Sequence, residues 1–116
     1  MSDLLVRAAG SLAICIALLH GYLGETKIFA KTSIAPTWAR RILWAVFHHS
    51  VVVWITMGLL LILVPTLGSE RARYAIIAAS VAIFGSAAMA NAWATRGRHF
   101  GWAALSVVVG LAVAGI

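Results

Sequence analysis

Long apolar stretches dominate this chain and leave it few ways to fold. Four of them are separated by short connections that hold nearly all of the charged residues. They cover, approximately, residues 4–23, 41–64, 74–94 and 100–116. A helix needs roughly 20 mostly apolar residues to cross the hydrocarbon core of a bilayer. The pattern therefore predicts an all-α membrane protein with four transmembrane helices in a single domain, residues 1–116.

The composition argues against a soluble domain. Hydrophobic residues make up 63% of the chain and charged residues only 10%, whereas soluble domains carry about 25% charged residues. Because the connections are short, neighbouring helices should be antiparallel and form a compact four-helix bundle. No small-x-small cleavage site follows the first apolar stretch before Glu25, so we expect this stretch to be retained.

The basic residues indicate how the bundle sits in the membrane. Six of them flank the first and third connections, and three lie at the opposite side. In that order they are Lys27, Lys31, Arg40, Arg41, Arg96 and Arg98, then Arg7, Arg71 and Arg73. The positive-inside rule predicts a bacterial cytoplasmic (inner) membrane protein with both connections in the cytoplasm and both termini outside. Anionic lipid head groups account for the net charge of +6, and no nucleic-acid partner is expected.

Small residues recur every four positions in three of the stretches and predict where helices touch. The stripes are Ala9, Ala13, Ala17 and Gly21; Ala78, Ala82, Ser86 and Ala90; and Ser106, Gly110 and Ala114. Lipid supplies no hydrophobic force between helices, so close packing depends on such residues. We expect these stripes to face the interior of the bundle.

Strongly polar side chains gather in the cytoplasmic half of the predicted bundle. They come from all four helices and their ends: His20, Glu25, His48, His49, Asn91, Arg96 and His99. Such groups are costly inside a membrane and by default face the bundle and mark a functional site. Adjacent helical residues point about 100° apart, so only one of His48 and His49 should face inward.

The residue types suggest three kinds of ligand. Imidazole and carboxylate together favour a transition metal such as iron, zinc or copper. Two histidines on adjacent helices, His20 and His48, could instead ligate a single haem b. A quinone or lipid head group could be held by histidine, asparagine and arginine. The predicted metal ligands are His20, Glu25, His48 and His99. The predicted cofactor-binding residues are His20, His48, Asn91 and Arg96.

No pattern of high specificity identifies an enzyme or a transporter. Cys15 is the only cysteine, in apolar surroundings that keep a thiol inert. Ser50 lies close to His48 in sequence, but no buried acid accompanies the two to form a triad. Four-helix multidrug exporters of similar length are a poor match. They depend on a carboxylate in the middle of helix one, whereas Asp3, Glu25 and Glu70 all lie at the ends of the predicted helices.

Several short motifs resemble those of a known family. The chain reads HGYLGE at residues 20–25, a basic pair at Arg40 and Arg41, FHHS at 47–50 with Trp54, and RGRH at 96–99. It resembles small, uncharacterised bacterial four-helix membrane proteins with IHSxLGE, WHxxSVxW and RGRH patterns. Phe47 replaces the usual Trp, and Gly21 replaces Ser. The resemblance implies that His20, Glu25, His48 and His99 are the family-like positions. It implies no activity.

Three functional hypotheses follow from the sequence. The first is a cytoplasmic-side His/Glu cofactor site, for a metal or a haem, with a role in redox chemistry or cofactor binding. The second is a non-enzymatic accessory or assembly subunit, whose polar layer only locks helices together and whose stripes bind a membrane protein partner or another copy. The weaker third is a small-solute transporter.

Overall fold

The computed structural model describes residues 1–116 and contains four α-helices and no strand. The helices are α1 (Ser2–Leu23), α2 (Thr37–Leu63), α3 (Glu70–Thr95) and α4 (Gly101–Ala114). A π-helical segment, η1 (Gly24–Phe29), extends α1, and a 3-10 turn, η2 (Val64–Thr66), ends α2. The predicted all-α class with four helices is confirmed.

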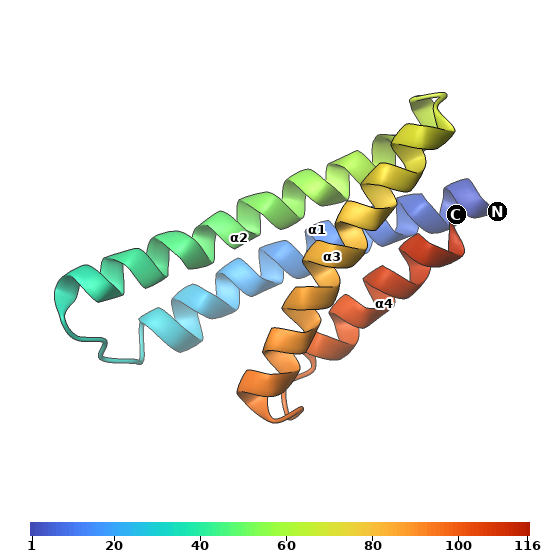
Figure 1. Ribbon diagram of the computed structural model, residues 1–116. Coiled ribbons are helices and arrows are strands. Elements are labelled where there is room, and N and C mark those ends of the chain that lie inside the picture. Colours follow the sequence, from blue (N-terminus) through green and yellow to red (C-terminus); the bar gives the residue numbers. More distant parts are fainter.

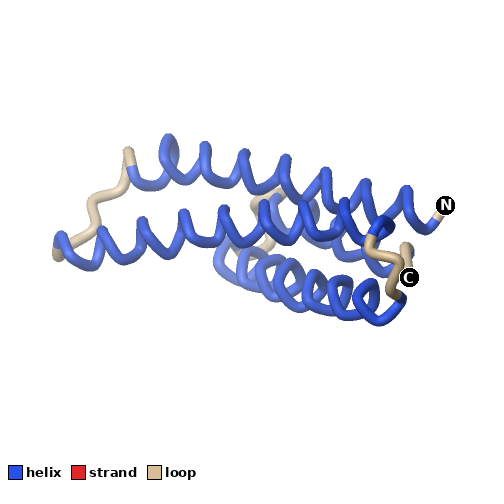
Figure 2. The backbone as a smooth tube through the Cα atoms, turned by 90° about the horizontal axis from the view of Figure 1, so that it is seen from above, coloured by secondary structure: helices blue, strands red, loops and turns tan.

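The helices form two hairpins, α1–α2 and α3–α4, and α1 lies between α2 and the second hairpin (Figure 1). α1 packs along α2 and along α4, and α3 packs on α4. α2 and α3 are joined through η2 but then diverge, so that contact between them is sparse. The two chain ends lie close together at one end of the bundle (Figures 1 and 2).

The α1–α2 hairpin projects beyond the turn between α3 and α4 (Figures 1 and 2). α1 and η1 together have 28 residues, which corresponds to about 42 Å. α4 has 14 residues, or about 21 Å, and is shorter than the predicted span 100–116. Three helices are long and apolar enough to cross a membrane: Ser2–Phe29, Thr37–Thr66 and Glu70–Thr95.

The helices of the projecting hairpin are longer than their apolar stretches. The first was expected to end near Leu23, yet helical structure continues to Phe29, and α2 begins at Thr37 rather than near Arg41. Lysine, arginine and glutamate are good helix formers. Polar helical turns therefore continue past the point where the apolar pattern stops.

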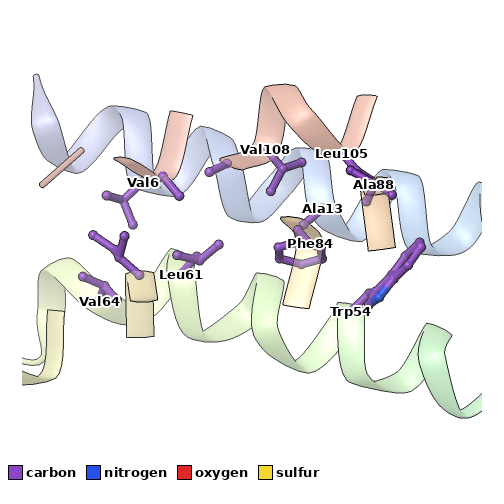
Figure 3. Close-up of a cluster of buried hydrophobic side chains, with 13 residues drawn as sticks. Val6, Ala13, Trp54, Leu61, Val64, Phe84, Ala88, Leu105 and Val108 are labelled. Atoms are coloured by element: carbon purple, nitrogen blue, oxygen red, sulfur yellow. The ribbon is translucent and has the colours of Figure 1, made fainter. Parts of the chain in front are cut away.

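The core forms where α1 presents its smallest residues (Figure 3). Ala9, Ala13 and Ala17 are fully buried, which confirms three of the four residues of the predicted stripe on α1, and the fourth, Gly21, is half-buried. Large side chains from the other helices fill the space opposite, among them Leu61, Phe84 and Leu105. Small residues facing large ones allow close interhelical packing without voids.

The predicted stripes on α3 and α4 are wrong as interior seams. All seven of these residues are exposed: Ala78, Ala82, Ser86, Ala90, Ser106, Gly110 and Ala114. The buried residues are instead Ile77, Ser80, Phe84 and Ala88 on α3, and Gly101, Leu105, Val108 and Ala112 on α4. α1 already supplies a small-residue face, and a second one opposite it would leave a void, which close-packed interiors avoid.

Two glycines set the distance between α1 and α2. A Cβ atom at Gly58 would lie 2.8 Å from the Gly10 carbonyl oxygen and 2.7 Å from Cγ1 of Ile14. A Cβ at Gly10 would collide with the Gly58 carbonyl in turn. The two backbones therefore approach as closely as they do only because both positions lack a side chain.

Arg73 joins three helices at the end of the bundle where the two chain termini lie. Its Nε and one terminal nitrogen donate to the Gly115 carbonyl, at 3.1 and 2.6 Å. Its other terminal nitrogen lies 2.7 Å from Oδ1 of Asp3. The guanidinium group of α3 thus caps the carbonyl end of α4 and pairs with the start of α1, where a carboxylate is favourable.

We expect Gly58→Leu to destabilise the protein and Gly110→Leu to be tolerated. Gly58 has no room for a side chain, so overpacking should cost about 1–3 kcal/mol. Gly110 faces open space, and both changes bring the same gain in helix propensity. Thermal unfolding in a mild detergent would measure the difference. Equal stability of the two variants would contradict the described α1–α2 contact.

We also expect Arg73→Ala to lower stability and Arg71→Ala to leave it nearly unchanged. Arg73 makes three side-chain contacts with α1 and the end of α4, whereas Arg71 is exposed. Loss of hydrogen bonds from a charged group should cost about 1.5–3 kcal/mol. Denaturation of both variants under the same conditions tests this, and a similar loss in both would count against the Arg73 contacts.

Candidate functional site

A pocket of about 340 Å³ lies where the α3–α4 hairpin ends beside the projecting α1–α2 hairpin. Its polar lining comes from three elements and the α3–α4 turn: His20, Lys27, Asn91, Thr95 and His99. Its apolar lining includes Leu19, Leu23, Trp54, Phe100 and Leu105. The structure thus brings together three of the predicted site residues, His20, Asn91 and His99.

His20 is held between two aromatic rings of α2. Its imidazole stacks on the Phe47 ring, with the ring centroids 4.1 Å apart. The centroid of the Trp54 ring lies 4.6 Å from that of the imidazole, and the two rings are tilted against each other. The Ser50 hydroxyl donates to the Phe47 carbonyl, so its oxygen can only accept from His20 Nε2, 3.5 Å away. A neutral imidazole that donates from Nε2 carries its lone pair on Nδ1.

Asn91 and His99 supply acceptors to the first turn of α4. Oδ1 of Asn91 accepts from the Trp102 backbone N–H at 3.1 Å, and Nδ1 of His99 accepts from the Gly101 N–H at 3.1 Å. These N–H groups have no partner within the helix. The contacts fix the orientation of the amide and the tautomer of the imidazole. Asn91 Nδ2 and His99 Nε2 remain as hydrogen-bond donors.

Two of the three remaining predicted site residues, Glu25 and His48, form a second group together with Trp44, which we call the Glu25 cluster. Oε1 of Glu25 accepts from the Trp44 indole N–H at 2.6 Å and lies 2.9 Å from His48 Nε2. The His48 and Trp44 rings are stacked, with centroids 4.2 Å apart. Neither Glu25 nor His48 lines the pocket. The acid of the predicted site is therefore engaged with α2.

The predicted metal ligands do not assemble into one set. No three histidine, cysteine, aspartate or glutamate side chains are grouped so as to hold a metal ion. Both ring nitrogens of His48 are engaged, one with the Trp44 carbonyl at 2.9 Å and the other with Glu25. His48 is therefore not available to pair with His20 as a haem ligand in this arrangement. Metal and haem binding stay predictions that the geometry does not support.

The other predicted residues lie outside the pocket. Arg96 ends α3 in a left-handed conformation, with φ 51°, and is absent from the pocket lining. His49 is exposed, so His48 is the histidine of the pair that faces its neighbours. Adjacent residues of an α-helix point about 100° apart around the helix axis, which explains why only one of the two histidines contacts η1.

The sequence interpretation missed three residues of this region. Lys27 lies seven positions after His20, a spacing that places both on one helical face and would have indicated it. Trp44 precedes His48 by four positions, which also places the pair on one face. Thr95 bonds the Asn91 carbonyl at 2.8 Å, a local contact for which no signal was available.

The only fixed charge in the lining of the pocket is positive. Lys27 is the only residue in its lining with a fixed formal charge, and no acid is among the lining residues. Glu25, two positions from Lys27, faces α2 instead. The free donors of Asn91, His99 and Lys27 outnumber the single acceptor of His20. A complementary ligand therefore carries oxygen acceptors on an otherwise apolar body.

The chain was compared with known proteins in three ways. No family model matches it, no curated protein matches it, and no solved structure matches it. The resemblance to small bacterial four-helix membrane proteins therefore stays a prediction.

We expect Asn91→Leu to destabilise the α4 end of the bundle and Asn91→Asp to preserve it. Aspartate keeps an oxygen that can accept from the Trp102 N–H, whereas leucine leaves that N–H unpaired. Removal of such a capping acceptor costs about 1 kcal/mol. Thermal unfolding of the two variants would show the difference, and equal destabilisation would argue against the capping role.

Proposed function

We propose that this protein spans the bacterial inner membrane and binds a lipid-soluble quinone in the pocket around His20. The role would be redox chemistry or cofactor binding, in line with the polar layer in the sequence. One observation carries the proposal: three elements and a turn converge on a donor-rich pocket that is otherwise lined by apolar and aromatic side chains. Membrane insertion is supported by three helices of sufficient length and apolarity.

The charge distribution supports a cytoplasmic location for the pocket. Lys27, Lys31, Arg40 and Arg41 lie on the projecting hairpin, and Arg96 and Arg98 lie at the α3–α4 turn. Both regions are at the pocket end of the bundle. Under the positive-inside rule this end faces the cytoplasm and both termini face outside.

The chemistry of a quinone head group matches the lining of the pocket. A quinone ring presents two carbonyl oxygens, which can accept from Asn91 Nδ2, His99 Nε2 or Lys27. Its planar face suits an environment that includes Trp54 and Phe100. Small-molecule sites typically have volumes of about 300–1,000 Å³ with a few polar groups in an apolar lining. An isoprenoid tail would extend between helices into lipid.

The proposal is tested by titrating the purified protein in mild detergent with a short-tailed ubiquinone analogue. We expect Asn91→Asp to weaken binding roughly tenfold or more, because it replaces a donor by a carboxylate oxygen that repels a carbonyl. The same variant keeps the acceptor for Trp102, so the fold is preserved. Isothermal titration calorimetry measures the affinity, and His49→Gln, at an exposed histidine, is the matched control.

Absence of binding to the unmodified protein would refute the quinone proposal, as would an affinity indifferent to both Asn91→Asp and His20→Ala. Elemental analysis of the same preparation addresses the earlier metal hypothesis. Near-stoichiometric iron, copper or zinc that is lost in His20→Ala and in His48→Ala would favour a metal or haem site over a quinone.

A second candidate is the accessory or assembly subunit. It is favoured by the outward position of the small-residue stripes on α3 and α4, which are free to pack against another membrane helix. In that case the polar layer would only lock helices together. His20→Gln would then preserve both the fold and complex formation, because an amide can replace the hydrogen bond. Small-solute transport, the weaker alternative, has no specific observation in its favour.

A further inference from the structure

The η1 segment has two faces with different partners. Lys27 and Ile28 line the pocket, while Glu25 and Phe29 face α2. Gly24 lies at the boundary, because it lines the pocket and a side chain there would meet the Phe47 ring of α2. One short segment is therefore both a wall of the pocket and a partner of α2, so its attachment to α2 determines the shape of the pocket.

Side chains of α2 fasten η1 at both of its ends. Near the start, Glu25 accepts from the Trp44 indole at 2.6 Å and pairs with His48 at 2.9 Å. Near the end, Arg40 donates to the Phe29 carbonyl at 2.7 Å. No hydrogen bond or ion pair joins η1 to α3 or α4. The segment is thus held from one side only, across the pocket from the α3–α4 turn.

The backbone of η1 is irregular. η1 is π-helical, with a hydrogen bond from the Ala30 N–H to the Glu25 carbonyl at 3.0 Å. Such wide turns are rare and frequently occur at functional sites. The segment lies beyond the α3–α4 turn, outside the tightly packed core of the bundle (Figures 1 and 2). Breaking the contacts of the Glu25 cluster would free the start of η1 from its polar contacts with α2 without disturbing the buried seam of α1, while the Arg40–Phe29 contact would still hold its end.

We propose that η1 is a strap along one side of the pocket and that the Glu25 cluster holds it in the position described. The inference rests on the proposed function, because it concerns access of a ligand to the same site. Glu25, Trp44 and His48 are then positioning residues: they touch no ligand but fix the wall that carries Gly24, Lys27 and Ile28. Ligand would be admitted and released when Glu25 parts from α2.

The position of the strap is measured directly by pulsed electron paramagnetic resonance. Spin labels are placed through Thr26→Cys on η1 and Arg98→Cys in the α3–α4 turn, in a Cys15→Ser background. We expect a narrow distance distribution across the pocket mouth that becomes broader and longer with Glu25→Ala. Glu70→Ala, which removes a carboxylate at the other end of the bundle, is the matched control. An unchanged distribution in Glu25→Ala would overturn the strap.

Exchange of the ligand gives the second measurement. With the short-tailed ubiquinone analogue as probe, we expect Glu25→Ala to raise the dissociation rate roughly two- to fivefold, as suits a partly exposed polar contact. The association rate should rise as well, so that the affinity changes less than either rate. A dissociation rate equal to that of the unmodified protein would count against the strap.

A third variant keeps the test decisive if Glu25→Ala folds poorly. Trp44→Phe retains a ring that can stack on His48 but removes the indole N–H that bonds Glu25, and it should broaden the same distance distribution. If the unmodified protein binds no quinone, the proposed function fails, while the distance measurement still decides whether η1 is held by the Glu25 cluster. The two failures are therefore distinguishable.

Discussion

The close approach of α1 to its neighbours is the constraint on which the rest of the structure depends. Alanines on one face of α1 and the Gly10–Gly58 contact bring the backbones together and fix the register of α1 against α2. The register then carries to the far end of the hairpin. There it places Gly24 against the Phe47 ring of α2. It also places Glu25 within contact distance of His48, the residue that follows Phe47. Packing in the apolar core thus positions polar groups well outside it.

The same register divides the polar layer into two parts with different chemistry. The only carboxylate of the layer, Glu25, is engaged by α2, and the pocket keeps donors, one imidazole acceptor and Lys27. A carboxylate inside the pocket would pair with Lys27 and favour a cationic ligand or a metal. Its placement on the opposite face of η1 is what makes an oxygen-bearing ligand the best complement.

The small-residue stripes illustrate where sequence patterns mislead. Ala13 and Ala82 belong to similar repeats, yet the first is fully buried and the second exposed. Spacing identifies a helical face but not its partner, and in lipid an exposed small residue carries little penalty. Polar groups are costly when unpaired, and three of those in the predicted layer, His20, Asn91 and His99, line the same pocket.

The sequence by itself determined the helical class, the approximate helices and the concentration of His20, Asn91 and His99 at one end. These depend on local properties, namely apolar length and the cost of burying polar groups. Only the tertiary structure decided that His48 rather than His49 is engaged, that Glu25 turns toward Trp44, and that Lys27 joins the pocket. Those outcomes depend on how far each helix is rotated and shifted against its neighbours. Rotation and shift are set by the summed packing of many side chains, which no single motif records.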